Sequence, residues 1–221
     1  GYGFNLGILI EPREDLRFSL TYRSKVEVEF KDVVDIKGIG PNLQALLDLI
    51  GVTSEKVDLE MELPQEVLIS GYYDLTDKVA LVASAGWQDW SNFGKSTLTL
   101  RSTNTTSFEA DRNFKDTWHA AIGARYRFAE PWLWSVGFAY DSSPVDDEDR
   151  TPDMPLDRQI RLATGLQYDW NENVTIGGAY TYIDLGDAEI DQQGGPLQGN
   201  LKGDYKTNHV HTLALNLVWR F

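Results

Sequence analysis

The last stretch of the chain, residues 209–221 with the sequence HVHTLALNLVWRF, decides the fold class. From Leu213 to Phe221 every second residue is leucine or an aromatic, and the residues between them are Ala, Asn, Val and Arg. Successive side chains of a β-strand point to opposite faces, so this pattern predicts a strand with one strongly apolar face. The strand ends the printed sequence on an aromatic residue, Phe221.

The same alternation recurs upstream, for example in residues 118–128 and 134–140. It predicts nine strands, at residues 3–10, 16–34, 57–73, 79–90, 115–128, 132–141, 158–169, 174–184 and 207–221. Tight turns rich in Pro, Asp and Asn occupy residues 11–15, 74–78, 129–131 and 169–173, and they alternate with long polar loops at 35–56, 91–114, 142–157 and 185–206. Short turns at one rim and long loops at the other indicate an all-β fold, an antiparallel transmembrane β-barrel of the bacterial outer membrane.

A soluble β-sandwich is the competing prediction, because its strands alternate as well. The polar face of the later strands, however, consists of Gly, Ala, Ser, Thr, Asn, Gln and Arg, with little Lys or Glu. Aromatic residues gather near strand ends, as aromatic girdles at the two membrane interfaces require. These are Tyr72, Tyr73, Trp87, Trp90, Trp118, Tyr126, Trp132, Trp134, Tyr140, Tyr168, Trp170, Tyr180, Tyr182 and Trp219. The barrel is therefore favoured strongly.

Composition excludes several classes. No run of about 18 apolar residues occurs, so no spanning helix is expected, and a mean hydropathy of −0.36 suits strands in which only alternate residues face lipid. A net charge of −14 without a basic stripe opposes nucleic-acid binding. The absence of cysteine excludes disulfides and thiolate metal sites. The chain begins at Gly1 without a charged and then apolar leader, so any secretory signal is expected outside this sequence.

The strand count suggests an incomplete barrel. Nine antiparallel strands leave the first and the last running in the same direction, and bacterial single-chain barrels have even strand numbers. An open edge in lipid leaves backbone groups without partners. Residues 1–221 are thus expected to form the C-terminal portion of one barrel domain whose earlier strands precede Gly1, and not to close into a stable barrel alone.

Several short motifs, in order and spacing, resemble the FadL family of outer-membrane transporters for long-chain fatty acids and hydrocarbons. The resemblance covers nearly the whole chain. Its motifs are Gly1-Tyr-Gly-Phe-Asn-Leu-Gly-Ile-Leu9, Phe18-Ser-Leu-Thr-Tyr-Arg-Ser-Lys-Val26, Leu63-Pro64, Ser70-Gly-Tyr72, Trp87-Gln-Asp-Trp-Ser91, Phe114-Lys-Asp116, Asp141-Ser-Ser-Pro-Val145, Asp149-Arg-Thr-Pro152, Tyr180-Thr-Tyr182 and the terminal Phe221.

The resemblance implies a fourteen-stranded barrel plugged by an N-terminal hatch, of which this chain would be the last nine strands. It implies passage of a hydrophobic small molecule, a fatty acid or hydrocarbon, by a monomer in contact with lipid and lipopolysaccharide. No enzymatic activity and no cofactor are expected. A terminal aromatic such as Phe221 resembles the signal that the outer-membrane assembly machinery reads.

The loop at 35–56 carries an apolar helical pattern. Asn42 can cap a short helix, Gly51 can end it, and its apolar face would be Leu43, Leu46, Leu47 and Ile50. In the resembled family this loop forms part of an apolar groove where substrate lands first. A lid packed over the barrel mouth is the alternative, and the two roles are compatible.

Arg112 and Lys115 lie where a loop enters a strand, and a cation in a partly dry pocket favours an anionic headgroup. The resemblance associates a basic residue just before Phe114-Lys-Asp116 with the substrate carboxylate, and Arg112 is near that position. Exposure to water or to lipopolysaccharide phosphates is the alternative for both residues. The polar-face arginines are expected to pair with inner carboxylates, the hatch or turn carbonyls, and this structural role is favoured over substrate contact. They are Arg17, Arg23, Arg125, Arg127, Arg161 and Arg220.

Other chemistry is not indicated. No Ser, His and acid form a recognisable hydrolase motif, and His119 is expected to be a hydrogen-bonding residue of the inner face. His209 and His211 share a strand face, but no third metal ligand is evident. The alternatives to hydrophobic transport are a polar-solute porin, a structural or adhesive surface protein with acidic loops and, least favoured, an acyl-modifying enzyme.

Overall fold

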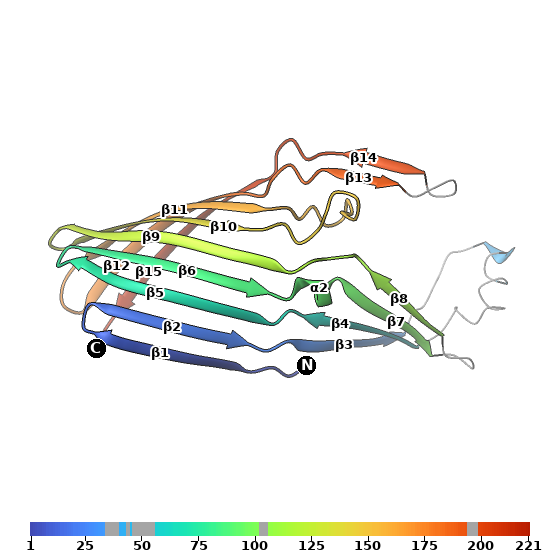
Figure 1. Ribbon diagram of the computed structural model, residues 1–221, viewed down its shortest axis with the longest axis horizontal. Coiled ribbons are helices and arrows are strands. Elements are labelled where there is room, and N and C mark those ends of the chain that lie inside the picture. The colour runs from blue at the N-terminus through green and yellow to red at the C-terminus, as the bar shows by residue number, and fades with distance from the viewer. Residues whose placement is uncertain (34–39, 43–44, 46–55, 102–105, 194–198) are drawn as a thin grey trace.

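The computed structural model describes residues 1–33, 40–42, 45, 56–101, 106–193 and 199–221 (Figure 1). Nine strands form one antiparallel sheet in the order β1-β2-β5-β6-β9-β10-β11-β12-β15. Their bounds are β1 Asn5–Arg13, β2 Leu16–Arg23, β5 Glu66–Thr76, β6 Val79–Gln88, β9 Thr117–Ala129, β10 Trp132–Asp141, β11 Gln159–Asp169, β12 Val174–Asp184 and β15 His209–Trp219. The nine-stranded antiparallel prediction is confirmed.

The rims of the sheet differ as the turn pattern predicts. Short turns join β1 to β2, β5 to β6, β9 to β10 and β11 to β12 at one end, and Figure 1 shows the long connections at the other end. The strands hold 8 to 13 residues, which brackets the 9 to 11 that a tilted strand needs to cross a bilayer. Among the described residues, no helix is long and apolar enough to cross a membrane.

The two faces of the sheet differ in chemistry. On the outer face large apolar side chains are left exposed instead of being packed into a core, for example Leu6 at 62%, Ile122 at 61% and Leu215 at 92%. The inner face carries Ser, Thr, Gly, Ala, Arg and Asp at the alternate positions. An exposed apolar face of this size requires a non-aqueous neighbour. Lipid is that neighbour for a barrel strand.

An aromatic girdle follows the short-turn rim. The rings of Trp132 and Tyr168 pack at a tilt with centroids 4.5 Å apart, and Phe128 and Trp170 extend the row on either side. Tyr72 is an exception to the girdle prediction. The β2–β5 register pairs it with Arg17 on the inner face.

Two predicted strands and two predicted loops are corrected. The stretch 16–34 is two strands, β2 and β3 (Val26–Val33), and 57–73 divides into β4 (Lys56–Leu63) and β5. Pro64 lacks an N–H and cannot continue the ladder of hydrogen bonds between strands. At the other break, the N–H of Phe4 donates to Ser24 Oγ at 2.9 Å. The loop at 91–114 contains a short helix, α2 (Trp90–Phe93), and two strands, β7 (Lys95–Arg101) and β8 (Thr106–Asp111).

The additional strands build structures beyond the long-loop rim. A second sheet has the order β3-β4-β7-β8, and Figure 1 shows β3 and β4 continuing the lines of β2 and β5. The predicted loop at 185–206 contains a hairpin of β13 (Ile190–Gln193) and β14 (Asn200–Gly203). Sequence alternation cannot distinguish a strand in the membrane from one above it, which explains these errors.

Candidate functional site

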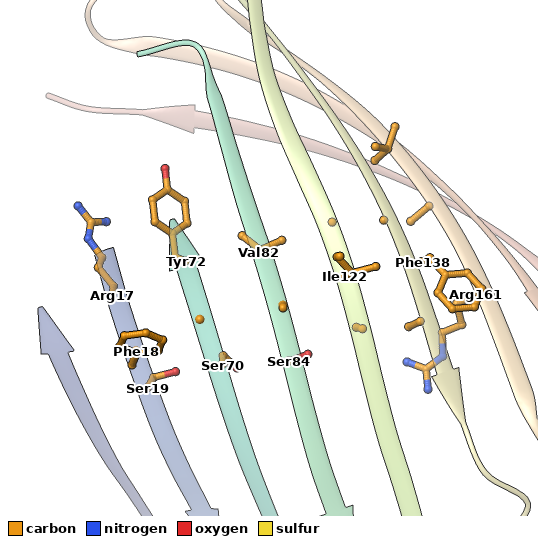
Figure 2. A pocket seen from close by; sticks show the side chains of 18 of the residues that line it. Arg17, Phe18, Ser19, Ser70, Tyr72, Val82, Ser84, Ile122, Phe138 and Arg161 are labelled. Atoms are coloured by element: carbon orange, nitrogen blue, oxygen red, sulfur yellow. The ribbon is translucent and has the colours of Figure 1, made fainter. Parts of the chain in front are cut away.

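The inner face of the sheet bears a hollow of about 700 Å³, shown in Figure 2. Its walls come chiefly from inner-face residues of β2, β5, β6, β9, β10 and β11. Strand register places one residue from each strand in a row across the hollow. The row runs Ser19, Ser70, Ser84, Ala121, Ala139 and Arg161.

The ends of the hollow are cationic and its middle is small. At one end Arg17 lies over the ring of Tyr72, 5.3 Å from its centroid, and pairs with Glu11 at 2.9 Å. Arg161 occupies the other end (Figure 2). Between them the lining is small, with Ala121, Gly123, Gly137, Ala139 and Ala163. These small residues leave room for a ligand above the strand backbone, between the two arginines.

A chain of hydrogen bonds connects Ser84 to Arg161. Ser84 Oγ lies 3.3 Å from His119 Nε2, and His119 Nδ1 lies 2.9 Å from Asp141 Oδ1. The other carboxylate oxygen, Asp141 Oδ2, accepts from Arg161 Nη2 at 2.5 Å. We name these four residues the inner relay. No sequence motif places a Ser beside a His, but strand register brings Ser84 and His119 together in space from 35 residues apart.

Arg161 keeps donor capacity within the inner relay. Its two recorded hydrogen bonds, to Asp141 and to Gln159 at 3.5 Å, both come from Nη2. Its Nε is buried without a partner among the described residues. The side chain is 36% exposed and lines the hollow. The guanidinium is thus anchored by one nitrogen and open toward the hollow.

Arg112 and Lys115, the predicted headgroup ligands, lie at the long-loop rim and outside the lining of the hollow. Arg112 Nη2 pairs with Asp153 at 3.0 Å, and its Nη1 donates to Thr151 at 3.1 Å. Lys115 Nζ pairs with Asp146. Hydrogen bonds from Thr151 and from Arg112 hold the pKa of Asp153 below its usual value. Both cations therefore fasten the 142–158 connection to the start of β9.

The predicted apolar face of the rim helix, Leu43, Leu46, Leu47 and Ile50, lies outside the described residues. The described neighbours Pro41, Asn42 and Ala45 are helical. Asn42 is thus inside the helix instead of at its cap, and proline at the start of a helix explains why.

A second cluster of polar side chains lies beside α2, where β6 ends. The buried Asp89 accepts from Gln65 Nε2 at 2.9 Å, Ser91 Oγ at 3.0 Å and Asn92 Nδ2 at 2.7 Å. Burial raises the pKa of Asp89, but these hydrogen bonds outweigh burial and hold the pKa below its usual value. The motif Trp87-Gln-Asp-Trp-Ser91 is therefore a structural joint between β6 and the second sheet.

A buried arginine closes the 142–158 connection. Arg150 is 1% exposed and donates to backbone oxygens of Leu156 at 2.7 Å, Val145 at 3.2 Å and Glu189. Its Nη1 also pairs with Asp147 at 2.5 Å. The motif Asp149-Arg-Thr-Pro152 thus ties two long connections together over the barrel rim.

His209 and His211 face outward, and Tyr180 Oη lies 2.7 Å from His211 Nδ1. Their rings pack against Tyr182, 5.8 and 5.4 Å between centroids. Within the described part of the chain, no three His, Cys, Asp or Glu side chains are grouped to share a metal ion. This cluster belongs with the membrane-interface aromatics.

A family model described as outer membrane protein transport protein (OMPP1/FadL/TodX) matches residues 1–221. The chain belongs to the FadL family. It is 33% identical over 190 residues to the long-chain fatty acid transport protein of Escherichia coli O6:H1, covering 83% of this chain and 42% of that protein. The 47 kDa outer membrane protein of Pasteurella multocida is 28% identical over 229 residues, covering 100% of this chain and 50% of that protein.

The chain spans about half the length of the curated FadL relatives it matches. The solved structure of a Pseudomonas aeruginosa FadL homologue superposes with a TM-score of 0.79 at 21% identity, covering 97% of this chain and 50% of that one. The Pseudomonas putida toluene transporter TodX superposes with a TM-score of 0.56 at 15% identity, covering 98% and 48%.

These comparisons confirm the fold and the compartment. The FadL family member described here is a β-barrel protein of the Gram-negative outer membrane. Its relatives are named as transporters and channels and not as enzymes. The inner relay is therefore taken only as part of the inner face of the barrel.

Proposed function

We propose that this chain forms part of the wall of an outer-membrane transporter for long-chain fatty acids or other hydrophobic molecules. The observation that carries the proposal is the family match over residues 1–221. Relatives named for fatty-acid transport and for toluene transport support a hydrophobic substrate. The hollow beneath the rim adds a place where such a molecule can rest inside the barrel.

The entry step belongs to the same proposal. An apolar groove at the long-loop rim, formed by Leu43, Leu46, Leu47 and Ile50, collects the ligand. Arg112 and Lys115 attract its carboxylate, since their side chains remain 38% and 49% exposed in their ion pairs. The ligand then passes through a barrel plugged by a hatch. We also propose that lipopolysaccharide contacts the outer rim, that the assembly machinery recognises Phe221, and that the protein is a monomer.

The edges of the sheet support a larger barrel domain. β1 and β15 are the two outermost strands of the described sheet and run in the same direction. A spanning sheet needs partners on both edges, so we propose that further strands complete one domain. Residues 1–221 by themselves are then expected to give no heat-labile compact band on a detergent gel. Appearance of that band would contradict the proposal.

Uptake measures the function directly. The complete protein that carries this chain, expressed in a Gram-negative host without its own transporter, is expected to raise the uptake of radiolabelled oleate several-fold. A vector without insert and a boiled membrane fraction give the background. Equal uptake with and without the protein would exclude the proposal.

Single-channel conductance distinguishes the proposed transporter from a polar-solute porin. The polar inner face supplies the observation that favours this second candidate. In planar bilayers a porin conducts steadily at single-channel level, whereas a plugged transporter does not. An acidic surface adhesin would instead lose adhesion, and keep oleate uptake, when residues 142–157 are replaced.

A further inference from the structure

We propose that Arg161 forms a binding site for the carboxylate of an amphipathic ligand on the inner wall of the barrel, with Asp141 and His119 as positioning residues and Ser84 opposite. The inference rests on the proposed function for the class of ligand, a long-chain monocarboxylate. It adds a site that is distinct from the rim cations Arg112 and Lys115. This site would distinguish an acid from a neutral hydrocarbon inside the barrel.

The position of Arg161 supports a headgroup site. Register places Arg161, Ala139 and Ala121 side by side on β11, β10 and β9, with Ser84 next on β6. The methyl groups of the two alanines leave the guanidinium and the Ser84 hydroxyl standing on either side of a low floor, as Figure 2 shows for the labelled pair. Neighbouring strands lie about 4.8 Å apart, so the three spacings from β6 to β11 set Ser84 and Arg161 about 14 Å apart along the sheet.

The inner relay fixes the guanidinium without using all of its donors. Asp141 is only 21% exposed and is shared between Arg161 and His119, so it is held from two sides. Arg161 has five N–H donors, and only Nη2 has recorded partners. The Nε is buried, so a carboxylate would bind through the terminal nitrogen Nη1, which has no recorded partner, without breaking the pair of Nη2 with Asp141. A preorganised cation of this kind loses little entropy on binding.

The tail has a place beside the headgroup. Gly137 and Ala163, on β10 and β11, lie one row toward the short-turn rim from Ala139 and Arg161 and line the same hollow. A Cβ added at Gly137 would meet only one other atom within 4 Å, the carbonyl oxygen of Ile122 at 3.8 Å. The space above Gly137 is thus open, and a large side chain there would occupy the volume proposed for the tail.

Two ligands that differ only in the headgroup test the site. Equilibrium binding of radiolabelled oleate and of oleyl alcohol is measured on the complete protein in detergent micelles. Arg161→Met is expected to weaken oleate binding about ten-fold, the loss of a hydrogen bond to a charged group, and to leave oleyl alcohol binding within about two-fold. Asp141→Asn can keep an oxygen acceptor for Arg161 while its amide group faces His119, and it removes the competing charge. It is expected to keep or raise oleate affinity.

Matched variants separate a binding role from a structural one. Arg127→Met removes an inner-face arginine that pairs with Asp169 at 3.3 Å and does not line the hollow, so both affinities should be unchanged. Gly137→Leu should weaken both ligands. If Arg161→Met leaves oleate binding intact, or weakens oleate and oleyl alcohol equally, the headgroup site is overturned while the proposed function stands. Wild-type protein that binds neither ligand overturns both.

Discussion

At the scale of single residues, the described long-loop rim is held by polar side chains with unusually complete sets of partners. Arg150 donates to three backbone oxygens and pairs with a carboxylate, and Asp89 accepts from three side chains. Both are buried. A buried polar group without its partners is costly, so each of these clusters forms as a unit or not at all.

Arg150→Met should detach the 142–158 connection. Methionine fills part of the volume but leaves Asp147 and the oxygens of Val145 and Leu156 without their donor. Leaving a buried hydrogen-bond acceptor without its donor costs about 1–3 kcal/mol. Limited proteolysis of the protein in outer membranes is expected to cut within 142–158 only in the variant. Arg158→Met is the control, because Arg158 is 41% exposed and pairs at the surface with Asp184. Equal protection of both variants would contradict the clamp.

The Asp89 joint should loosen in acid. The pKa of Asp89 is lower in the folded protein than in the unfolded chain, because hydrogen bonds to the charged form outweigh burial. Its stabilising contribution is therefore complete above the usual carboxyl pKa of about 3.9 and is lost as the pH falls through the lower folded value. Tryptophan fluorescence from Trp90 between pH 6 and 2 measures it. Asp89→Asn should remove the low-pH transition, and a transition that persists in this variant would assign it elsewhere.

At the scale of elements, strand pairs differ in how much room they leave at their glycines. Gly123 of β9 and Gly137 of β10 face each other in register. A Cβ at Gly123 would lie 2.9 Å from the carbonyl oxygen of Val136, too close without a backbone shift, whereas Gly137 has open space. The pair is therefore asymmetric although the residues are chemically identical.

Gly123→Ala should destabilise the barrel by about 1–3 kcal/mol, the usual cost of overpacking. Gly137→Ala, its partner across the ladder, should change stability by less than about 0.5 kcal/mol. Urea unfolding of the complete protein in lipid vesicles provides the measurement. Equal effects at the two positions would mean that the β9–β10 spacing differs from the one described.

At the scale of the whole molecule, the apolar surface lies on the outside and the described residues contain few buried apolar side chains. The outer face of β15 shows this most clearly, with Leu213 at 81% and Leu215 at 92% exposed. Stability thus comes from a continuous ladder of backbone hydrogen bonds and from contact with lipid, not from a central core.

Leu215→Arg is therefore expected to cost about 2–4 kcal/mol, as arginine does near the middle of the bilayer. Asn216→Arg, one residue later on the inner face, should cost much less because its charge can reach the polar interior. Folding yield into vesicles and the urea midpoint compare the two variants. A larger loss for Asn216→Arg would invert the assignment of the two faces.

The sequence by itself determined that nine strands form the main sheet, that these strands have one apolar and one polar face, and which rim carries the short turns. These follow from local alternation and turn chemistry, because a strand's side-chain period is fixed by its backbone. Alternation alone did not reveal that residues 16–34 and 57–73 divide between two sheets. Pro64 and the contact of Ser24 with Phe4 lie at the two breaks.

The four residues of the inner relay come together only in the tertiary structure. Ser84, His119, Asp141 and Arg161 lie on four strands and share no local motif, and their meeting depends on the register of β6, β9, β10 and β11. Register is a property of pairs of strands, set by turns and by both faces at once. The arginines of the polar face could be expected to find carboxylates. The sequence could not show that Arg161 would keep N–H donors without partners beside an open hollow.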